Sequence, residues 1–365
     1  MKTNCRALTS LLVSLSISFS IAIAFSAAPR AQTAPLPPPP KPAATDPDPK
    51  TDRLCDEAAN PDAAPDKIQI HCRLESGEFA PAPASPAPAK QAVIVAYNME
   101  RGMKLDKQIE LLKNNPEFAN PDIMLISEAD RGCSRTNYRN VTRELAKALG
   151  MNYVYGVEYI ELPRRAKLAT DNNETMCEHG NAVLSKYPIS GAGQIRHKET
   201  QSWYIPPGPG RENMQPRLGG VMAVIADIAF PGSPLRVYSA HLESALNGGN
   251  EMRRSEAMEI AAHADGVSGP VVIGGDMNTL LYYNDIQSGG KKEYAPQVFF
   301  DAGFIDAHSA LPYKKRGTTI LQFGMRPVID LIMVRGVQTL QSGVCPSKVC
   351  DPLSDHLPVW TKIAF

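Results

Sequence analysis

The sequence predicts an α/β protein in which helices pack outside β-sheets, and two observations support this fold class. Short runs rich in Val and Ile recur along the chain and have the length of buried strands. Helical patterns lie between some of these runs, as expected where helices cover sheets. The strand-like runs are residues 92–96, 123–126, 183–184, 221–228, 235–239, 271–273, 328–334 and 359–363, and the helical segments are residues 105–114, 139–149 and 251–264.

The composition is that of a soluble globular protein and names no partner. The 365 residues include 38 Lys+Arg and 38 Asp+Glu, and 43% are hydrophobic, which excludes wholesale disorder. Because the formal net charge is zero, binding to a polyanion would need a local basic patch. The first ninety residues are dense in proline, holding 15 of the 32, and the block that follows is long enough for one large domain.

The N-terminal segment has the pattern of a secretory signal peptide. Lys2 and Arg6 precede an uncharged apolar stretch over residues 8–28, which ends in small residues suited to cleavage. We therefore expect residues 1–28 to be removed from a protein exported to the periplasm or the extracellular space. An uncleaved membrane anchor is the alternative, and the serines within the apolar stretch disfavour it.

Residues 29–90 are predicted to be a Pro-rich leader outside the packed core. Prolines crowd into residues 32–50 and 81–88, and such segments favour extended spacers. The part between them is too short and polar for a core of its own, although a disulfide over residues 55–72 would close a small loop there. The expected organisation is a signal peptide, this leader, and a catalytic domain over residues 91–365.

The cysteines indicate disulfide bonds. Cys5 leaves with the signal peptide, and six cysteines in an exported chain favour disulfides over zinc ligands or free thiols. The sequence alone does not choose among the connectivities that six cysteines allow. The simplest non-nested pairing joins Cys55 to Cys72, Cys133 to Cys177 and Cys345 to Cys350.

Polar residues gather where the strand-like runs end. Asp276 and Asn278 are two residues apart, so both side chains would project from one face of an extended segment. Asp330 lies inside an apolar run, where an unpaired charge is costly. If the strand ends meet at one rim, they place carboxylates, amides and imidazoles in one cleft. The set comprises Asn98, Glu128, His241, Asp276, Asn278, Asp330, Asp355 and His356.

Such a set suits the hydrolysis of a phosphate ester, which first needs a hard cation to neutralise the phosphate oxygens. Glu128 with Asp355 or Asn98 offers the oxygen ligands that Mg²⁺ prefers. Mn²⁺ and Ca²⁺ are the alternative ions. The sequence therefore predicts a divalent metal site around Glu128.

The same reaction needs an activated water and donors for the charge of the transition state. His356, held by a carboxylate such as Asp330, would serve as a base or an electrostatic partner. A protonated His241 and the amide of Asn278 would donate hydrogen bonds to the developing charge.

In these residues and their order, the sequence resembles the endonuclease/exonuclease/phosphatase superfamily, which includes DNase I, inositol polyphosphate phosphatases and neutral sphingomyelinases. A further matching motif is Gly-Asn-Ala-Val-Leu-Ser at residues 180–185. The resemblance covers nearly all of residues 91–365. It implies a DNase I-like four-layer sandwich, in which two packed, mainly antiparallel β-sheets are flanked by helices.

The resemblance also implies which residues bind the metal and the substrate. Glu128 would be the principal metal ligand, and Asp355 a further carboxylate on the metal side. Asn98 would contact both the metal shell and the phosphate. Asn181 and Asn278 would bind the substrate.

The catalytic roles implied by the resemblance fall on acids and imidazoles. Asp276 would orient or deprotonate the attacking water, and Asp330 and His356 would act as a carboxylate and imidazole pair. His241 resembles the second histidine of the DNase, sphingomyelinase and phosphatase branches. Apurinic endonucleases usually lack a histidine there, which disfavours that branch.

Two features bear on the substrate. Arg131, Arg135, Arg139 and Arg143 repeat every four residues, and on a helix they would form a basic stripe for nucleic-acid phosphates or a solvated face. Residues 203–208 form an aromatic loop that could stack on a base, touch a lipid surface or cover a sheet edge.

The sequence favours an exported, Mg²⁺-dependent phosphodiesterase, with a nuclease as the type most expected in this compartment. A sphingomyelinase-like lipid phosphodiesterase or a phosphatase is the enzymatic alternative, with a lipid head group as ligand in the first case. A non-catalytic binding module is the third reading, and the intact set of acids, amides and imidazoles disfavours it. We expect a monomer without an obligate protein partner, and the sequence leaves open DNA against RNA and endo against exo action.

Overall fold

A computed structural model describes most of the chain after the first 34 residues. The described residues are 35–43, 46–57, 70–81, 90–163, 175–198, 217–244, 249–281, 293–319 and 326–365. The predicted signal peptide and the aromatic loop at 203–208 lie outside them. Residues 32–365 cluster as one compact unit. Of the helices that the structure describes, none has the length and hydropathy to cross a bilayer.

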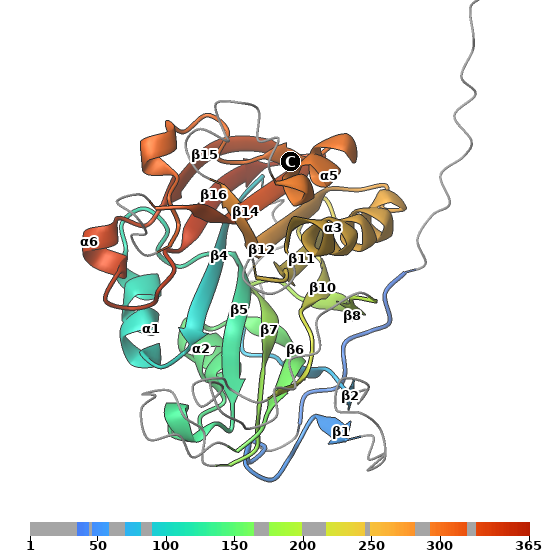
Figure 1. Ribbon diagram of the computed structural model, residues 1–365, viewed down its shortest axis with the longest axis vertical. Coiled ribbons are helices and arrows are strands. Elements are labelled where there is room, and N and C mark those ends of the chain that lie inside the picture. Colours follow the sequence, from blue (N-terminus) through green and yellow to red (C-terminus); the bar gives the residue numbers. More distant parts are fainter. Residues whose placement is uncertain are drawn as a thin grey trace, which may run out of the picture. The chain divides into compact units, whose positions relative to one another are not determined.

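The larger of two main sheets has eight strands in the order β15-β16-β4-β5-β7-β6-β3, with β9 paired to β6 (Figure 1). Its neighbours are antiparallel except for β4 and β5, which are parallel. The strands are β3 (Glu75–Gly77), β4 (Gln91–Arg101), β5 (Ile123–Arg131), β6 (Asn152–Glu161), β7 (Cys177–Ser185), β9 (Arg217–Gly219), β15 (Gln338–Val344) and β16 (Val359–Ala364).

The second sheet has six strands in the order β13-β14-β12-β11-β10-β8. Only β11 and β12 are parallel within it. The strands are β8 (Ile189–Arg196), β10 (Met222–Ile228), β11 (Leu235–His241), β12 (Val271–Leu281), β13 (Ile305–Asp306) and β14 (Val328–Arg335). A separate pair, β1 (Cys55–Glu57) and β2 (Ile70–Cys72), forms a small ribbon.

Three apolar clusters separate four layers, which confirms the predicted sandwich. The middle cluster lies between the two sheets and includes Ile94 and Ala96 of β4, whereas Val95 and Tyr97 point to the other face. On that face pack α1 (Leu105–Asn114) and α2 (Val141–Leu149), and α3 (Gly249–Asp265) and α5 (Tyr294–Asp301) cover the six-stranded sheet. Figure 1 shows α1 and α3 on opposite sides of the sheets. Because both faces of each sheet are covered, the strands appear in the sequence as continuous apolar runs.

The predicted helices form with small shifts at their ends. The segment expected at 139–149 becomes helical at Val141, because the side chain of Asn140 caps the helix by accepting a hydrogen bond from the Arg143 N–H at 3.1 Å. The segment expected at 251–264 forms most of α3. The strands β6, β8 and β15 were not predicted, because their glycines and polar residues interrupt the apolar pattern.

The Pro-rich leader differs from the extended spacer that we expected. Residues 75–77 form β3 and add a strand to the larger sheet. Pro37 accepts a hydrogen bond at 2.8 Å from the backbone of Ala192 at the edge of the other sheet. Farther along, the backbone of Pro49 passes so close to Gly132 that a Cβ there would lie 2.3 Å from the Pro49 oxygen. The compact unit therefore begins well before residue 91.

All three predicted disulfides form, joining Cys55 to Cys72, Cys133 to Cys177 and Cys345 to Cys350. The bond between Cys133 and Cys177 links the loop after β5 to the start of β7. It therefore fixes the two chain segments that carry Glu128 and Asn181.

The prediction that the four arginines form a stripe on one helix was wrong, because they do not lie in the same helix. Arg131 ends β5, and only Arg143 lies in α2. Each arginine is instead paired with carboxylates, for example Arg131 with Glu75 at 2.7 Å. Paired in this way, the arginines form no basic surface for nucleic acid.

Candidate active site

The predicted site residues lie at strand ends where the sheets are irregular. The pairing of β5 with β7 shifts between Ile126 and Ala129, which leaves Glu128 in a bulge with a φ of 54°. A second shift in β12 leaves Asn278 with a φ of 50°. Few residues other than glycine adopt this left-handed conformation, and bulges that re-aim a side chain are common beside active sites. The backbone therefore accepts local strain to point these two side chains into the cleft.

Asn98 joins the two sheets at the centre of the site. Its Nδ2 donates to Glu128 Oε1 on the same sheet and to Asp276 Oδ2 on the other, both at 3.0 Å. Its Oδ1 accepts from the Glu100 N–H at 3.0 Å, which fixes the orientation of the amide. Asn98 is fully buried, so it holds the two carboxylates at a set separation.

Glu128 is kept as a carboxylate by its surroundings. Burial raises its pKa, but the positive charges of Arg101 and His179 outweigh burial and hold the pKa well below the usual value. The nearest Arg101 nitrogen lies 3.8 Å from Glu128 Oε2. Glu128 is thus charged and available to a cation at neutral pH.

His356 and Asp330 form the predicted pair. Nδ1 of His356 donates to Asp330 Oδ2 at 2.9 Å, and Nε2 lies 3.6 Å from Asp276 Oδ2. Burial lowers the pKa of His356, but the charges of Asp330 and Asp276 raise it well above the usual value. The imidazole is therefore protonated at neutral pH and acts as a donor toward the cleft.

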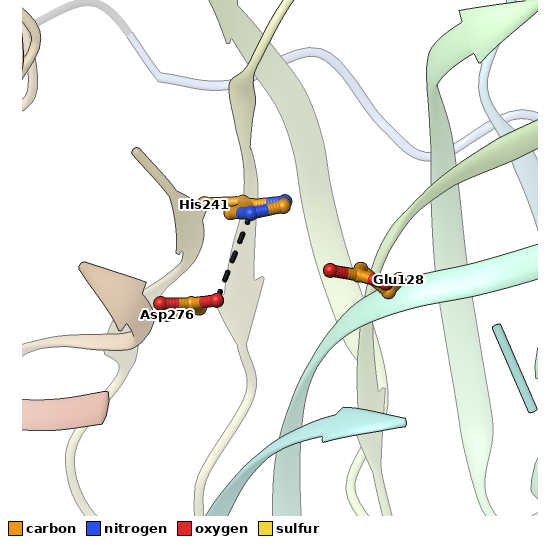
Figure 2. Close-up of side chains that lie close together, drawn as sticks. All are labelled: Glu128, His241 and Asp276. Atoms are coloured by element: carbon orange, nitrogen blue, oxygen red, sulfur yellow. Dashed lines mark ion pairs between the residues drawn. The ribbon is translucent and has the colours of Figure 1, made fainter. Parts of the chain in front are cut away.

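His241 is held in the same way by Glu158, a residue that the sequence did not reveal. Its Nδ1 lies 3.1 Å from Glu158 Oε1, and its Nε2 lies 3.7 Å from Asp276 Oδ2. Figure 2 marks the ion pair between His241 and Asp276 with a dashed line. Burial disfavours the charged ring, but Glu158 and Asp276 raise the pKa of His241 to about 10. Glu158 is fully buried in β6, a strand whose mixed pattern gave no signal for it.

Asn181 lies behind the site instead of on its surface. Its Nδ2 donates to Glu158 Oε2 at 2.8 Å and to the backbone oxygen of Met222 at 3.1 Å. The residue is fully buried. The geometry therefore gives Asn181 the task of positioning Glu158, whereas the resemblance implied a substrate contact.

Asp276 and Asn278 contact each other, but not as two side chains on one face of an extended segment, because the backbone of Asn278 is left-handed. The backbone N–H of Asn278 donates to Asp276 Oδ1 at 3.0 Å, and its Nδ2 donates to the Leu242 oxygen at 2.8 Å. Burial raises the pKa of Asp276, while the charges of His356 and His241 lower it. This carboxylate faces two imidazoles and an amide, the position from which an acid could hold a water molecule.

A third imidazole and carboxylate pair was also missed. His179 Nδ1 lies 2.9 Å from Asp130 Oδ1, and Asp130 is held by Arg135 Nε at 2.7 Å. All three side chains are buried. The alternation of acids and bases in β5 and β7 gave no signal for this pairing, because it depends on the register between the two strands.

The profile of the Endonuclease/Exonuclease/phosphatase family matches residues 95–356. The chain belongs to this family. Its members are metal-dependent phosphodiesterases and phosphatases, so the chain is a metal-dependent phosphoric ester hydrolase, as predicted. No curated protein matches the sequence.

Solved structures with a similar fold are more distant in sequence. A family protein from Beutenbergia cavernae has 14% identity and a TM-score of 0.54 over 76% of this chain and 72% of its own. A family protein from Leptotrichia buccalis has 16% identity and a TM-score of 0.51 over 75% and 100%. D. rerio TDP2, solved with a single-strand DNA product, has 15% identity and a TM-score of 0.51 over 76% and 100%. At these identities the likeness shows the shared fold.

The residues of this family member fit a divalent cation. Ligand atoms of Glu128, His241 and Asp276 lie within 4.8 Å of one another, and so do those of Asp276, Asp330 and His356. Because both histidines are held protonated by their partners, the carboxylates are the donors for a hard cation. When bound, the cation would neutralise phosphate oxygens, and Glu128 would hold it.

Asp355 is less central than predicted. It does not belong to either ligand group found among the described residues. Burial raises its pKa, and the charge of Glu128 raises it further. The carboxylates of Asp355 and Glu128 therefore share one electrostatic environment, and a cation between them would relieve their repulsion.

Proposed function

We propose that this protein is an exported phosphodiesterase that cleaves nucleic acid. One arrangement supports the proposed chemistry. Asn98 Nδ2 donates at 3.0 Å to a carboxylate oxygen of Glu128 and, on the other sheet, of Asp276, and the neighbouring His241 and His356 are kept protonated by their acid partners. Two fixed positive donors and two fixed carboxylates are what a pentacoordinate phosphate and an attacking water require.

The side chains divide the reaction between them. Nε2 of His241 and of His356 would donate to the phosphate oxygens as negative charge develops on them. Asp276 would accept the proton of the attacking water, since burial has raised its affinity for a proton. A cation held at Glu128 would be Mg²⁺, or Mn²⁺ or Ca²⁺ in its place.

The proposal of nucleic acid as the substrate class is supported by a solved structure with a similar fold. A structure with the same fold, that of D. rerio TDP2, holds a single-strand DNA product. Export is supported by the signal-peptide pattern at residues 1–28 and by three disulfides, which persist in oxidising compartments. N-terminal sequencing of protein secreted by an expression host would locate the cleavage expected at residue 28.

A substrate panel tests the proposal. The secreted protein would be incubated with plasmid DNA, RNA, sphingomyelin and bis(p-nitrophenyl) phosphate, each with Mg²⁺ and with EDTA. We expect cleavage of DNA or RNA and of bis(p-nitrophenyl) phosphate with Mg²⁺ alone. A preparation of Glu128→Gln purified in parallel controls for contaminating nucleases. Hydrolysis of sphingomyelin without nucleic-acid cleavage would overturn the proposed substrate class.

A further inference from the structure

A cavity of about 880 Å³ lies between β15, the segment leading into β16, and the 3₁₀ helix η3 (Tyr313–Lys315). We call it the basic cavity. Its lining includes Lys314, Lys315, Arg326, Gln341, Ser342 and Trp360. Cavities of roughly 300 to 1,000 Å³ are the size in which proteins hold small molecules. None of the predicted site residues lines it.

The walls of the basic cavity are formed by fixed parts of the chain. Trp360 is buried and leans over its cross-strand neighbour Gly343, where a Cβ would lie 2.6 Å from the indole nitrogen. Only glycine permits this approach at residue 343. The disulfide between Cys345 and Cys350 closes the adjoining turn, so the wall is held by a covalent bond as well as by the sheet.

The charge of the basic cavity is uncompensated. Lys314 and Lys315 are exposed and form no ion pair with the residues that the structure describes, whereas Arg326 is paired with Asp351 at 2.6 Å. Glu117 is the acidic side chain among the described lining residues. Adjacent lysines without counter-charges create a local positive potential in a chain whose net charge is zero. The lining therefore favours an anion.

One segment of chain separates the basic cavity from the catalytic centre. Gly317 and Leu357 line the cavity, and the Leu357 N–H donates to the Thr318 oxygen at 2.7 Å. On the other side of this segment, Thr318 Oγ1 accepts from the Asp330 N–H at 3.0 Å. Thr319 forms an isolated bridge with His356. A ligand that fills the cavity thus adjoins the scaffold of the imidazole pair.

We propose that the basic cavity binds the stretch of nucleic acid strand that flanks the scissile phosphodiester, with Lys314 and Lys315 facing a backbone phosphate. This inference rests on the proposed function. Proteins hold single strands by joining a positive groove to aromatic and polar side chains, the combination present here. A lipid would also need an exposed apolar surface, and the large exposed hydrophobic residues described on β15 and the helix α6 (Ser347–Cys350) are single ones, Leu340 and Val349.

Trp360 provides a direct test of binding. The chain has two tryptophans, so Trp203→Phe leaves Trp360 as the sole tryptophan reporter in the cavity wall. This variant would be titrated in EDTA with thymidine 5′-monophosphate, inorganic phosphate and phosphocholine. We expect thymidine monophosphate to change the fluorescence saturably. We also expect Lys314→Glu with Lys315→Glu to weaken binding at least tenfold, or about 1.4 kcal/mol.

The control variant carries Lys41→Glu with Lys90→Glu, two exposed lysines with no described ion pair, and it should bind as the parent does. An unchanged fluorescence, equal binding by the charge-reversed variant, or stronger binding of phosphocholine would each overturn the inference. Equal affinity for inorganic phosphate would also overturn it, since the nucleoside would then contribute nothing. Binding is measured without catalysis, so it can succeed even if the protein cleaves no nucleic acid, and it can fail even if it does.

In the active protein, the same two substitutions should lower kcat/KM for an oligonucleotide relative to that for bis(p-nitrophenyl) phosphate, which has no flanking strand. Most of the change should lie in KM, because the lysines would bind the strand without touching the reacting phosphate. An unchanged ratio of the two kcat/KM values would contradict the proposed site.

Discussion

Two of the places where the molecule buries charge differ in how completely the hydrogen bonds of the buried atoms are satisfied. Around Arg131, which is fully buried, Glu75 accepts hydrogen bonds from Arg131 at 2.7 Å, Tyr153 at 2.6 Å and Asn140 at 2.8 Å. Glu178 pairs with the same guanidinium at 2.9 Å. No buried side-chain atom of these residues is left without a partner among those described.

The catalytic centre shows the opposite arrangement. Buried oxygens without a hydrogen-bond partner in the described part of the chain include Asp330 Oδ1, Asn181 Oδ1 and Ser127 Oγ. Each buried polar atom without a hydrogen-bond partner lowers the stability of the fold. Several such oxygens close together are therefore consistent with a role in catalysis or in binding. Both regions bury charge, and of the two the catalytic centre is the one that leaves buried oxygens without a partner among the described residues.

The largest effect should come from removing the charge of Glu128. Glu128→Gln keeps the shape and the hydrogen bond from Asn98 but removes the negative charge that a cation needs. We expect kcat/KM for bis(p-nitrophenyl) phosphate with Mg²⁺ to fall by about 10³-fold or more, with little change in the thermal unfolding midpoint. Glu78→Gln, at an exposed acid, is the matched control. Full activity of Glu128→Gln would show that the metal is bound elsewhere.

The pair of His356 and Asp330 should give the next largest effect. Since Asp330 fixes the imidazole through a 2.9 Å hydrogen bond, each residue acts through the other. We expect His356→Ala and Asp330→Asn each to lower kcat by about 10² to 10⁴-fold, and the double variant to lose little more. A double-mutant cycle measures the coupling. Losses that multiply independently in folded protein would leave Asp330 only a structural role.

The Arg131 cluster should respond in stability instead of catalysis. Glu75→Gln removes a counter-charge from a buried guanidinium, and breaking such a pair costs about 3 kcal/mol or more. Denaturant unfolding should show this loss for Glu75→Gln and a change of at most about 0.5 kcal/mol for the exposed Glu78→Gln. Equal stability of the two variants would mean that the leader contributes nothing to the fold. A large fall in kcat per folded molecule would break the distinction between the clusters.

Glu256 should give an effect that depends on pH. Burial raises its pKa from 4.5 to about 8, so the folded chain keeps a proton that the unfolded chain has already lost. Stability should therefore fall as pH rises from about 4.5 to about 8, by an amount that follows from about 1.4 kcal/mol per pKa unit. Glu256→Gln, which is always neutral, should show a shallower fall over this range. Parallel pH profiles of the two proteins would contradict the assignment.

The sequence predicted the residues that project from strand ends better than it predicted their partners. Glu128 and Asp276 were recognisable because each follows a continuous apolar run, and His356 because it immediately precedes one. Such patterns can be seen in the sequence alone. Glu158 was not, since its task depends on β6 lying beside β7 so that it meets Asn181 and His241. A contact between residues of different sheets produces no pattern in the sequence around either residue.

The same reason explains the errors outside the site. A spacing of four predicted a stripe of arginines, but the chain turns between Arg131 and Arg143, and each guanidinium found a carboxylate from another segment. Residues 29–90 were predicted to lie outside the packed core, yet residues 75–77, between the two Pro-rich stretches, add a strand to the larger sheet. Disulfides were expected from six cysteines behind a signal-peptide pattern, and the observed connectivity is the simplest non-nested one, which the sequence alone could not select.

The leader has a consequence for how this domain can be transplanted. The family profile begins at residue 95, yet Glu75 lies before that boundary and neutralises an arginine after it. A chimera that exchanged only residues 95–356 with a relative would separate the two charges. It would also replace Gly132, whose missing Cβ leaves room for the backbone of Pro49. A segment that is transferred between proteins as a folded unit must therefore include part of the leader, residues 29–90, as well as the residues that the profile covers.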